Sequence, residues 1–133
     1  FADDAPWFGY YWGPTAVLGK YEMTKVDIGD IDMAQHAINS NEDSPEDSLG
    51  VSGFPSAPVV NAVTADFANR EPEAFKFIQN MSFPNDVMSK MLAWKEANNA
   101  SADEAAAWVL TNHTDMVMGW VNADAKAKLE ALL

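Results

Sequence analysis

Apolar positions follow different spacings in the two parts of this chain. Up to about residue 64 they occur in short runs, whereas beyond it they recur every three or four residues. A short apolar run is typical of a buried strand, and a recurrence of three or four places residues on one face of a helix. The pattern therefore predicts a few strands followed by a run of about four helices, which is an α/β fold.

Two segments carry the strand prediction. Phe8 to Trp12 is aromatic and ends at Gly13-Pro14, a dipeptide that stops regular structure. Pro58 to Val63 is short and nearly continuously apolar, as expected of a strand that is buried on both faces. Residues 15–20 are compatible with a helical turn or with an irregular segment.

The stretch from about Asn39 to Pro58 is rich in Ser, Asn, Gly, Pro and acidic residues. This composition predicts a long exposed loop. A loop of this length inside a compact domain usually serves as a functional lid or connects two lobes. We favour a connection between lobes.

Helix signals are explicit after residue 70. Pro72 stands where the first turn of a helix tolerates proline, and Asn85 or Asp86 suits the N-cap of the next helix. Ser101 and Glu104 form a capping-box pattern, in which each side chain accepts a hydrogen bond from a backbone N–H group.

The chain end also shows helical spacing. A break is predicted at residues 112–114, with Thr114 capping the helix that follows it. A last amphipathic stretch carries Ala125, Leu129 and Leu132.

Composition excludes several classes of function. A length of 133 residues with 48% hydrophobic residues suits one core. Twenty acidic against eight basic residues give a net charge of -12, which opposes binding to nucleic acid phosphates. No segment approaches the roughly 20 apolar residues of a membrane-spanning helix. Cysteine is absent, which excludes disulfides and thiolate metal sites.

The motifs of common enzymes are missing too. The sequence holds no GxGxxG, GxxxxGK[ST], HExxH or GxSxG motif, so we predict neither an enzyme nor a cofactor. His36 and His113 have no metal-like spacing, and the acidic run from Asp27 to Asp32 departs from the EF-hand order. We therefore predict a solvated acidic loop and no metal site.

The five tryptophans are not equivalent. Trp94, Trp108 and Trp120 stand in helical stripes beside Met and Val, where aromatic side chains fill a core. Trp12 instead closes the first predicted strand beside two tyrosines and directly before Gly-Pro. For Trp12, the pattern alone is equally compatible with core packing and with the edge of a cleft.

Four segments nevertheless occur in an order that is typical of one known family. They are Phe8 to Pro14, Gly53-Phe54-Pro55 with the apolar run after it, Ala65 to Ala74, and Met118 to Val121. Together they resemble the substrate-binding proteins of glycine betaine/proline-type ABC importers. Phe8 to Pro14 is similar to the aromatic-Trp-x-Pro segment of that family, in which the tryptophan forms part of an aromatic cage.

This resemblance implies a type II periplasmic-binding-protein-like fold with two lobes, of which the chain holds only the C-terminal half. Residues 1–50 then belong to one lobe with a ligand-side strand, 51–64 hold the return strand, and 65–133 form the helical segment. The N-terminal half is expected to be missing from this chain. The resemblance also implies a partner, the ABC transporter membrane permease, and a periplasmic or extracellular, membrane-associated location.

The implied ligand is a compact quaternary-ammonium solute such as glycine betaine. Trp12 is expected to form a wall of its site, and Tyr10 has the same facing as Trp12 if the strand is regular. Gly13 belongs to the same ligand-binding segment. Thr15 is the nearest donor for the ligand carboxylate, through its hydroxyl or its N–H. Proline betaine, choline, carnitine, trimethylamine oxide and sulfonium analogues stay open as ligands.

Two alternative functions stay open from the sequence. One is a ligand-sensing or regulatory domain with the same fold. The other is a helical interaction domain without a small ligand, in which Trp12 is buried.

Overall fold

The computed structural model describes residues 6–41, 43–47 and 50–132. The chain forms two compact units. One combines Phe1–Met23 with Asn61–Leu133, and the other is Thr24–Val60.

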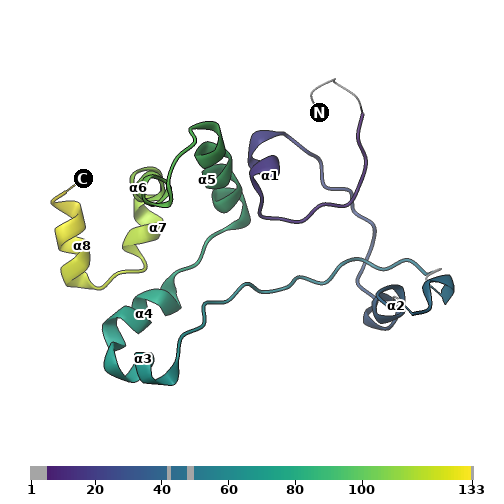
Figure 1. The fold of residues 1–133 in the computed structure, drawn as a ribbon, viewed down its shortest axis with the longest axis horizontal. Helices are drawn as coiled ribbons and strands as arrows, with labels where there is room; N and C mark the ends of the chain where they lie inside the picture. The colour runs from purple at the N-terminus through teal and green to yellow at the C-terminus, as the bar shows by residue number, and fades with distance from the viewer. Residues whose placement is uncertain (1–5, 42, 48–49, 133) are drawn as a thin grey trace. The chain divides into compact units, whose positions relative to one another are not determined.

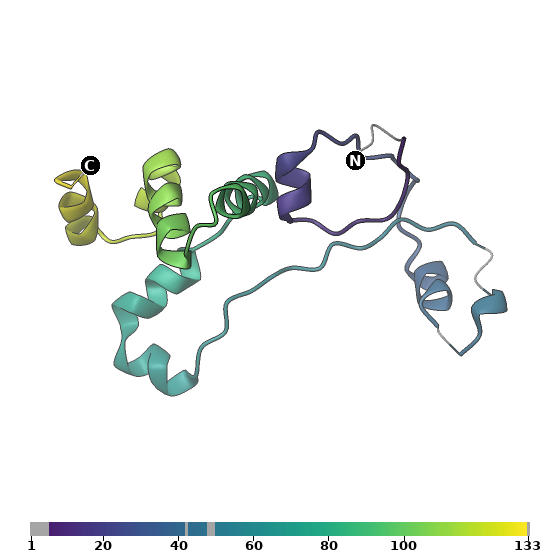
Figure 2. The same ribbon diagram turned by 45° about the horizontal axis from the view of Figure 1, so that its top comes forward.

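The larger unit is helical (Figure 1). Its helices are α1 (Ala16–Lys20), α3 (Ala65–Arg70), α4 (Pro72–Asn80), α5 (Asn85–Ala97), α6 (Ala102–Asn112), α7 (Thr114–Met118) and α8 (Ala123–Glu130). Helix α1 packs on α5, although some seventy residues separate them in the sequence, and the two lie side by side in both views (Figures 1 and 2). The remaining main contacts of this unit join neighbours along the chain, α3 with α4, α5 with α6, and α6 with α7.

The capping predictions have mixed outcomes. The capping box of Ser101 and Glu104 is confirmed at the start of α6. Helix α5, however, begins after Pro84 without a side-chain cap, so the predicted cap by Asn85 or Asp86 is wrong. The predicted break between α6 and α7 is also present, but the Thr114 hydroxyl donates back to the Leu110 carbonyl at 2.8 Å and does not cap α7.

The predicted α/β fold is wrong, because the described residues contain no strand. Phe8 to Trp12 and Pro58 to Val63 are irregular, and Val59 is 94% exposed instead of buried on both faces. A strand requires hydrogen bonds to a neighbouring strand. The apolar pattern shows that a segment has the composition of a strand, but it does not show whether a second strand lies beside it.

The helical region is also more divided than predicted. Six helices lie between residues 65 and 130, where we predicted about four helices. Pro72 begins a new helix immediately after Glu71, because proline at the first helical position lacks the N–H that would continue α3.

The core of the larger unit is small. Its buried apolar residues are Val87, Ala105, Val109 and Trp120. Trp94 and Trp108 are half-buried and stack with ring centroids 5.8 Å apart, which joins α5 to α6. The predicted core position of Trp120 is confirmed.

The smaller unit contains α2 (Met33–Asn39) and the 3₁₀ helix η1 (Pro45–Asp47). Asp32 caps α2, which the sequence analysis missed, and its N–H donates to Ser52 Oγ at 3.1 Å. The Gly53 N–H donates to the Asp30 carbonyl at 3.1 Å. These bonds join residues 30–32 to residues 52–53, which lie inside the segment predicted as a long loop. The 3₁₀ helix η1 lies inside that segment too.

Within the part of the chain that the structure describes, every helix is too short or too polar to cross a membrane.

Candidate functional site

Two aromatic rings stand together and exposed at the end of the first aromatic segment. Trp12 is 67% exposed and Tyr10 is 54% exposed. Their ring centroids lie 5.8 Å apart with an interplanar angle of 77°, an edge-to-face contact. The expected proximity of these two side chains is therefore present without a regular strand. We call them the Tyr10–Trp12 pair.

The other rings of the segment lie elsewhere. Trp7 packs over the backbone of Gly9, where an added Cβ atom would lie 2.6 Å from the indole ring. Phe8 is 82% exposed. Further along, the Lys20 ammonium lies 5.6 Å from the centroid of the Tyr21 ring, so the face of this ring already contacts a cation within the protein.

The pair is joined to α1 through Gly13 and Pro14. The Gly13-Pro14 peptide bond is cis. A Cβ atom added at Gly13 would lie 3.2 Å from Leu18 Cδ1, so the side chain of Leu18 covers this glycine. The residue that follows the pair is thus in contact with α1.

Thr15 makes two hydrogen bonds within the protein. Its hydroxyl oxygen accepts a hydrogen bond from the Leu18 N–H at 3.4 Å, which caps α1. Its own N–H donates to Ser89 Oγ at 3.2 Å. The N–H is therefore engaged, and the hydroxyl hydrogen is the donor that Thr15 has left for a ligand.

Ser89 is the residue of this region that sequence reasoning missed. It lies on α5, 74 positions from Thr15, and is only 5% exposed. A serine amid the apolar stripe of a helix gives a weak signal, because its partner is invisible until the fold brings α1 and α5 together.

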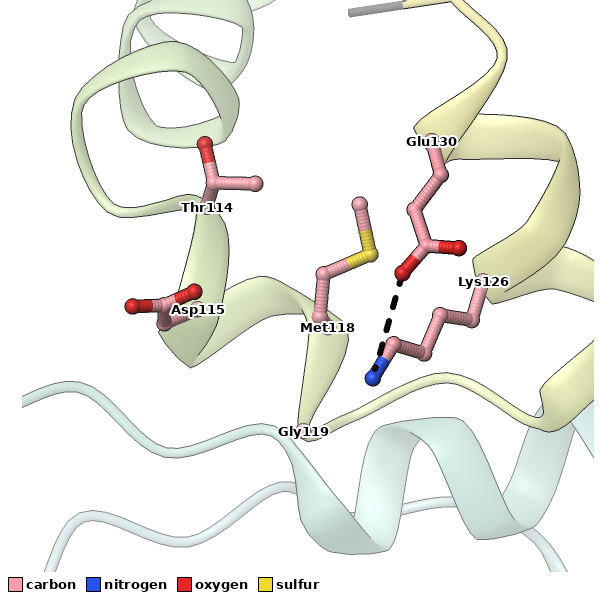
Figure 3. A pocket seen from close by; sticks show the side chains of 6 residues that line it. All are labelled: Thr114, Asp115, Met118, Gly119, Lys126 and Glu130. Atoms are coloured by element: carbon pink, nitrogen blue, oxygen red, sulfur yellow. Dashed lines mark ion pairs between the residues drawn. The ribbon is translucent and has the colours of Figure 1, made fainter.

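Two surface hollows lie away from this region. One of about 400 Å³ is bordered by Thr114, Asp115, Met118, Gly119, Lys126 and Glu130. Figure 3 shows the ammonium of Lys126 directed toward Glu130, with a distance of 4.0 Å between Nζ and Oε1. The residues that border this hollow include no aromatic side chain, the group on which recognition of a trimethylammonium depends. A smaller hollow of about 280 Å³ lies beside Trp94 and Trp108.

In the acidic run from Asp27 to Asp32, two aspartate side chains accept hydrogen bonds from nearby backbone N–H groups. Asp27 Oδ1 accepts from the Gly29 N–H at 2.9 Å, and Asp32 Oδ1 accepts from two N–H groups at the start of α2. Among the described residues there is no group of three or more side chains placed to hold a metal ion.

Comparison with known families identifies a match. The model for the substrate-binding domain of an ABC-type glycine betaine transport system matches residues 1–112. The matched residues include the Tyr10–Trp12 pair, Thr15 and Ser89, whereas Met118 to Val121 lies beyond them. Among curated proteins, none matches the chain.

The family match confirms the resemblance found in the sequence. A substrate-binding domain holds its ligand without transforming it, so the prediction that the chain is not an enzyme is also confirmed. Solute binding within a glycine betaine-type ABC transport system is confirmed at the level of the family. The chain belongs to the family of substrate-binding domains of ABC-type glycine betaine transport systems.

Proposed function

We propose that the Tyr10–Trp12 pair forms one wall of an aromatic cage for the quaternary ammonium group of glycine betaine. The observation that carries the proposal is the exposure of Trp12, 67%, combined with its edge-to-face contact with Tyr10. Tyr10 supports one edge of the indole, and the indole keeps most of its surface accessible. An exposed ring held by a second ring suits a ligand that binds to aromatic faces.

The chemistry of the ligand explains why aromatic rings are suited to it. A trimethylammonium group has no N–H to donate, so its recognition depends on the negative face of an aromatic ring. Each ring contributes about 0.5 to 2 kcal/mol, whereas micromolar affinity requires about 8 kcal/mol. The Tyr10–Trp12 pair is therefore one wall of a cage that needs further groups.

Thr15 is proposed to bind the carboxylate end of the ligand through its hydroxyl. Its N–H donates to Ser89, which leaves the hydroxyl hydrogen as the donor. Gly13 lies between Trp12 and Thr15 in the chain and is proposed to belong to the same ligand site. The site then provides an aromatic face for the cation and a hydroxyl for the anion of one zwitterion.

The surrounding charge does not select this ligand. Glycine betaine carries no net charge, so the net charge of -12 neither attracts nor repels it over a distance. We propose that the protein works in the periplasm or at the outer side of the membrane, where it delivers the solute to the membrane permease of its ABC transporter.

Replacement of Trp12 tests the proposal. In the natural full-length protein, Trp12→Ala is expected to abolish glycine betaine binding in isothermal titration calorimetry, with an unchanged circular dichroism spectrum. Phe8→Ala is the matched control, because it removes an exposed ring of the same segment that lies outside the pair. Affinity that survives Trp12→Ala within a factor of a few would rule out this site.

A further inference from the structure

Helix α1 is held by its contact with α5 and not by a core of its own. It has five residues, and none of them is buried. A helix of one turn is unstable by itself in water, because its nucleation cost exceeds the gain from so few hydrogen bonds. The position of α1 therefore depends on its contacts with α5.

Gly19 allows the closest approach between the two helices. A Cβ atom added at Gly19 would collide with the carbonyl group of Ser89, which belongs to the backbone of α5. A backbone atom in the middle of a helix has little freedom to move aside. Any side chain at position 19 therefore forces α1 away from α5 or changes its direction.

Ser89 supplies the directional bond at this contact. Burial of a hydroxyl without a partner is unfavourable, and serine has only a modest preference for helix interiors. In α5, however, Ser89 Oγ accepts the Thr15 N–H at 3.2 Å. This bond holds Thr15, the N-cap residue of α1, against the buried Ser89 of α5.

Short links connect this contact to the Tyr10–Trp12 pair. Only Gly13 and Pro14 lie between Trp12 and Thr15 in the chain, and the Leu18 side chain of α1 covers Gly13. A displacement of α1 therefore moves the residues that directly follow Trp12 in the chain.

We propose that Gly19 and Ser89 form a dock that sets the position of the Tyr10–Trp12 pair, with Ser89 as a positioning residue for ligand binding. This inference rests on the function proposed above for the pair. Ser89 does not touch the ligand. It acts through Thr15, so that both the indole face and the Thr15 hydroxyl depend on one buried oxygen atom.

The first test removes the directional bond from the natural full-length protein. Ser89→Ala is expected to weaken glycine betaine binding about tenfold in calorimetry, since one hydrogen bond that orders the site is lost. Ser82→Ala is the matched control and is expected to leave affinity unchanged, because Ser82 is exposed in the irregular segment before α5. Unchanged affinity in Ser89→Ala would overturn the dock.

The second test blocks the close approach. Gly19→Ala is expected to weaken binding more than Ser89→Ala does, because its Cβ meets backbone. Gly119→Ala is its control, since a Cβ atom there would lie 3.3 Å from the Met116 carbonyl oxygen, a far milder contact. Equal affinities of Gly19→Ala and Gly119→Ala would overturn the dock.

A spectroscopic measurement separates positioning from general loosening. With 5-fluorotryptophan incorporated, each indole gives its own ¹⁹F resonance, and Trp12→Phe assigns that of Trp12. Ser89→Ala is expected to shift the Trp12 resonance while those of Trp94 and Trp108 stay in place. Shifts of all the tryptophan resonances together would show a structural effect only and contradict the proposal.

The same set of variants distinguishes the two proposals. If Trp12→Ala abolishes binding while Ser89→Ala changes neither affinity nor the Trp12 resonance, the dock is wrong and the cage wall stands. If Trp12→Ala leaves binding intact while Ser89→Ala shifts the Trp12 resonance, the cage wall is wrong and the dock is reduced to a structural contact.

Discussion

The two aromatic regions of the larger unit differ in what their rings contact. Around α4 to α7, Trp120 is 8% exposed and lies edge-on to Phe83 and Phe77, with ring centroids 4.9 and 6.4 Å away. In the N-terminal segment, Trp12 contacts Tyr10 and stays 67% exposed. The same residue type thus fills a core in one region and presents a surface in the other.

This difference teaches that aromatic content alone does not identify a binding site. The stripes of the helical region provide several apolar neighbours for each ring, and burial follows from them. The N-terminal segment has no such stripe, and its rings remain at the surface. Clustered exposed apolar groups are typical of interaction sites, which is why the exposed region is the better candidate for ligand binding.

The largest expected effect contrasts Trp120 with Trp12. Trp120→Ala is expected to lower the free energy of unfolding by about 3 kcal/mol, because a buried ring is lost from between two phenylalanines. Trp12→Ala is expected to change it by less than about 0.5 kcal/mol, since the ring is exposed. Urea denaturation followed by circular dichroism measures both. Equal losses in the two variants would break the comparison.

The next effect concerns the start of α6, the helix that carries Trp108. Ser101→Ala removes the oxygen that accepts the Glu104 N–H at 3.2 Å. We expect a loss of about 1 kcal/mol in the free energy of unfolding, as is usual for an N-cap serine. Ser82→Ala serves as the control, since Ser82 is exposed outside a helix. A loss no greater than that of the control would show that the packed region does not need this cap.

A smaller effect is expected with pH. Hydrogen bonds from the Ser101 N–H and hydroxyl hold the pKa of Glu104 below its usual value of 4.5. A lowered folded-state pKa gives stabilisation that is present above the unfolded-state pKa and is lost as the pH falls through the folded-state pKa. Urea unfolding at a series of pH values should therefore show a stability loss below about pH 4.5.

Glu104→Gln tests the origin of this pH dependence. The amide keeps a hydrogen-bonding oxygen for the capping box but does not titrate in this range. The variant should lose the part of the pH dependence that belongs to Glu104, whereas Asp103→Asn, in the same first turn, should retain it. The same pH profile in Glu104→Gln and in the unaltered protein would exclude Glu104 as the source.

The capping box was predictable because its signal is local. Ser101 and Glu104 lie three residues apart, so the sequence pattern contains the whole interaction. Tyr10 also lies beside Trp12, but the regular strand from which their shared facing was predicted is absent. Where a competing local bond exists, the prediction was wrong, since the hydroxyl of Thr114 binds the Leu110 carbonyl instead of capping α7.

The rest depends on contacts between distant residues. The bond between Thr15 and Ser89 spans 74 positions, and no pattern within either segment indicates it. The two strands failed in a related way. Phe8 to Trp12 and Pro58 to Val63 have the composition of strands, but composition does not specify a pairing partner. Helices close their hydrogen bonds within one segment and were therefore predicted far better.

The smallest expected effect concerns the other exposed apolar segment. Val59 is 94% exposed, and nearby Asn61 Nδ2 donates to the Ile78 carbonyl at 3.1 Å. Val59→Ser is therefore expected to change the free energy of unfolding of this chain by less than about 0.5 kcal/mol. Asn61→Ala, which removes the hydrogen bond to the Ile78 carbonyl, should lower the free energy of unfolding more than Val59→Ser does.

Urea denaturation measures both variants. A loss above about 1 kcal/mol for Val59→Ser would show that the valine is covered and that this segment does have a partner. In that case the segment around Val59 would be buried like the aromatic residues around Trp120, and the Tyr10–Trp12 pair would remain exposed.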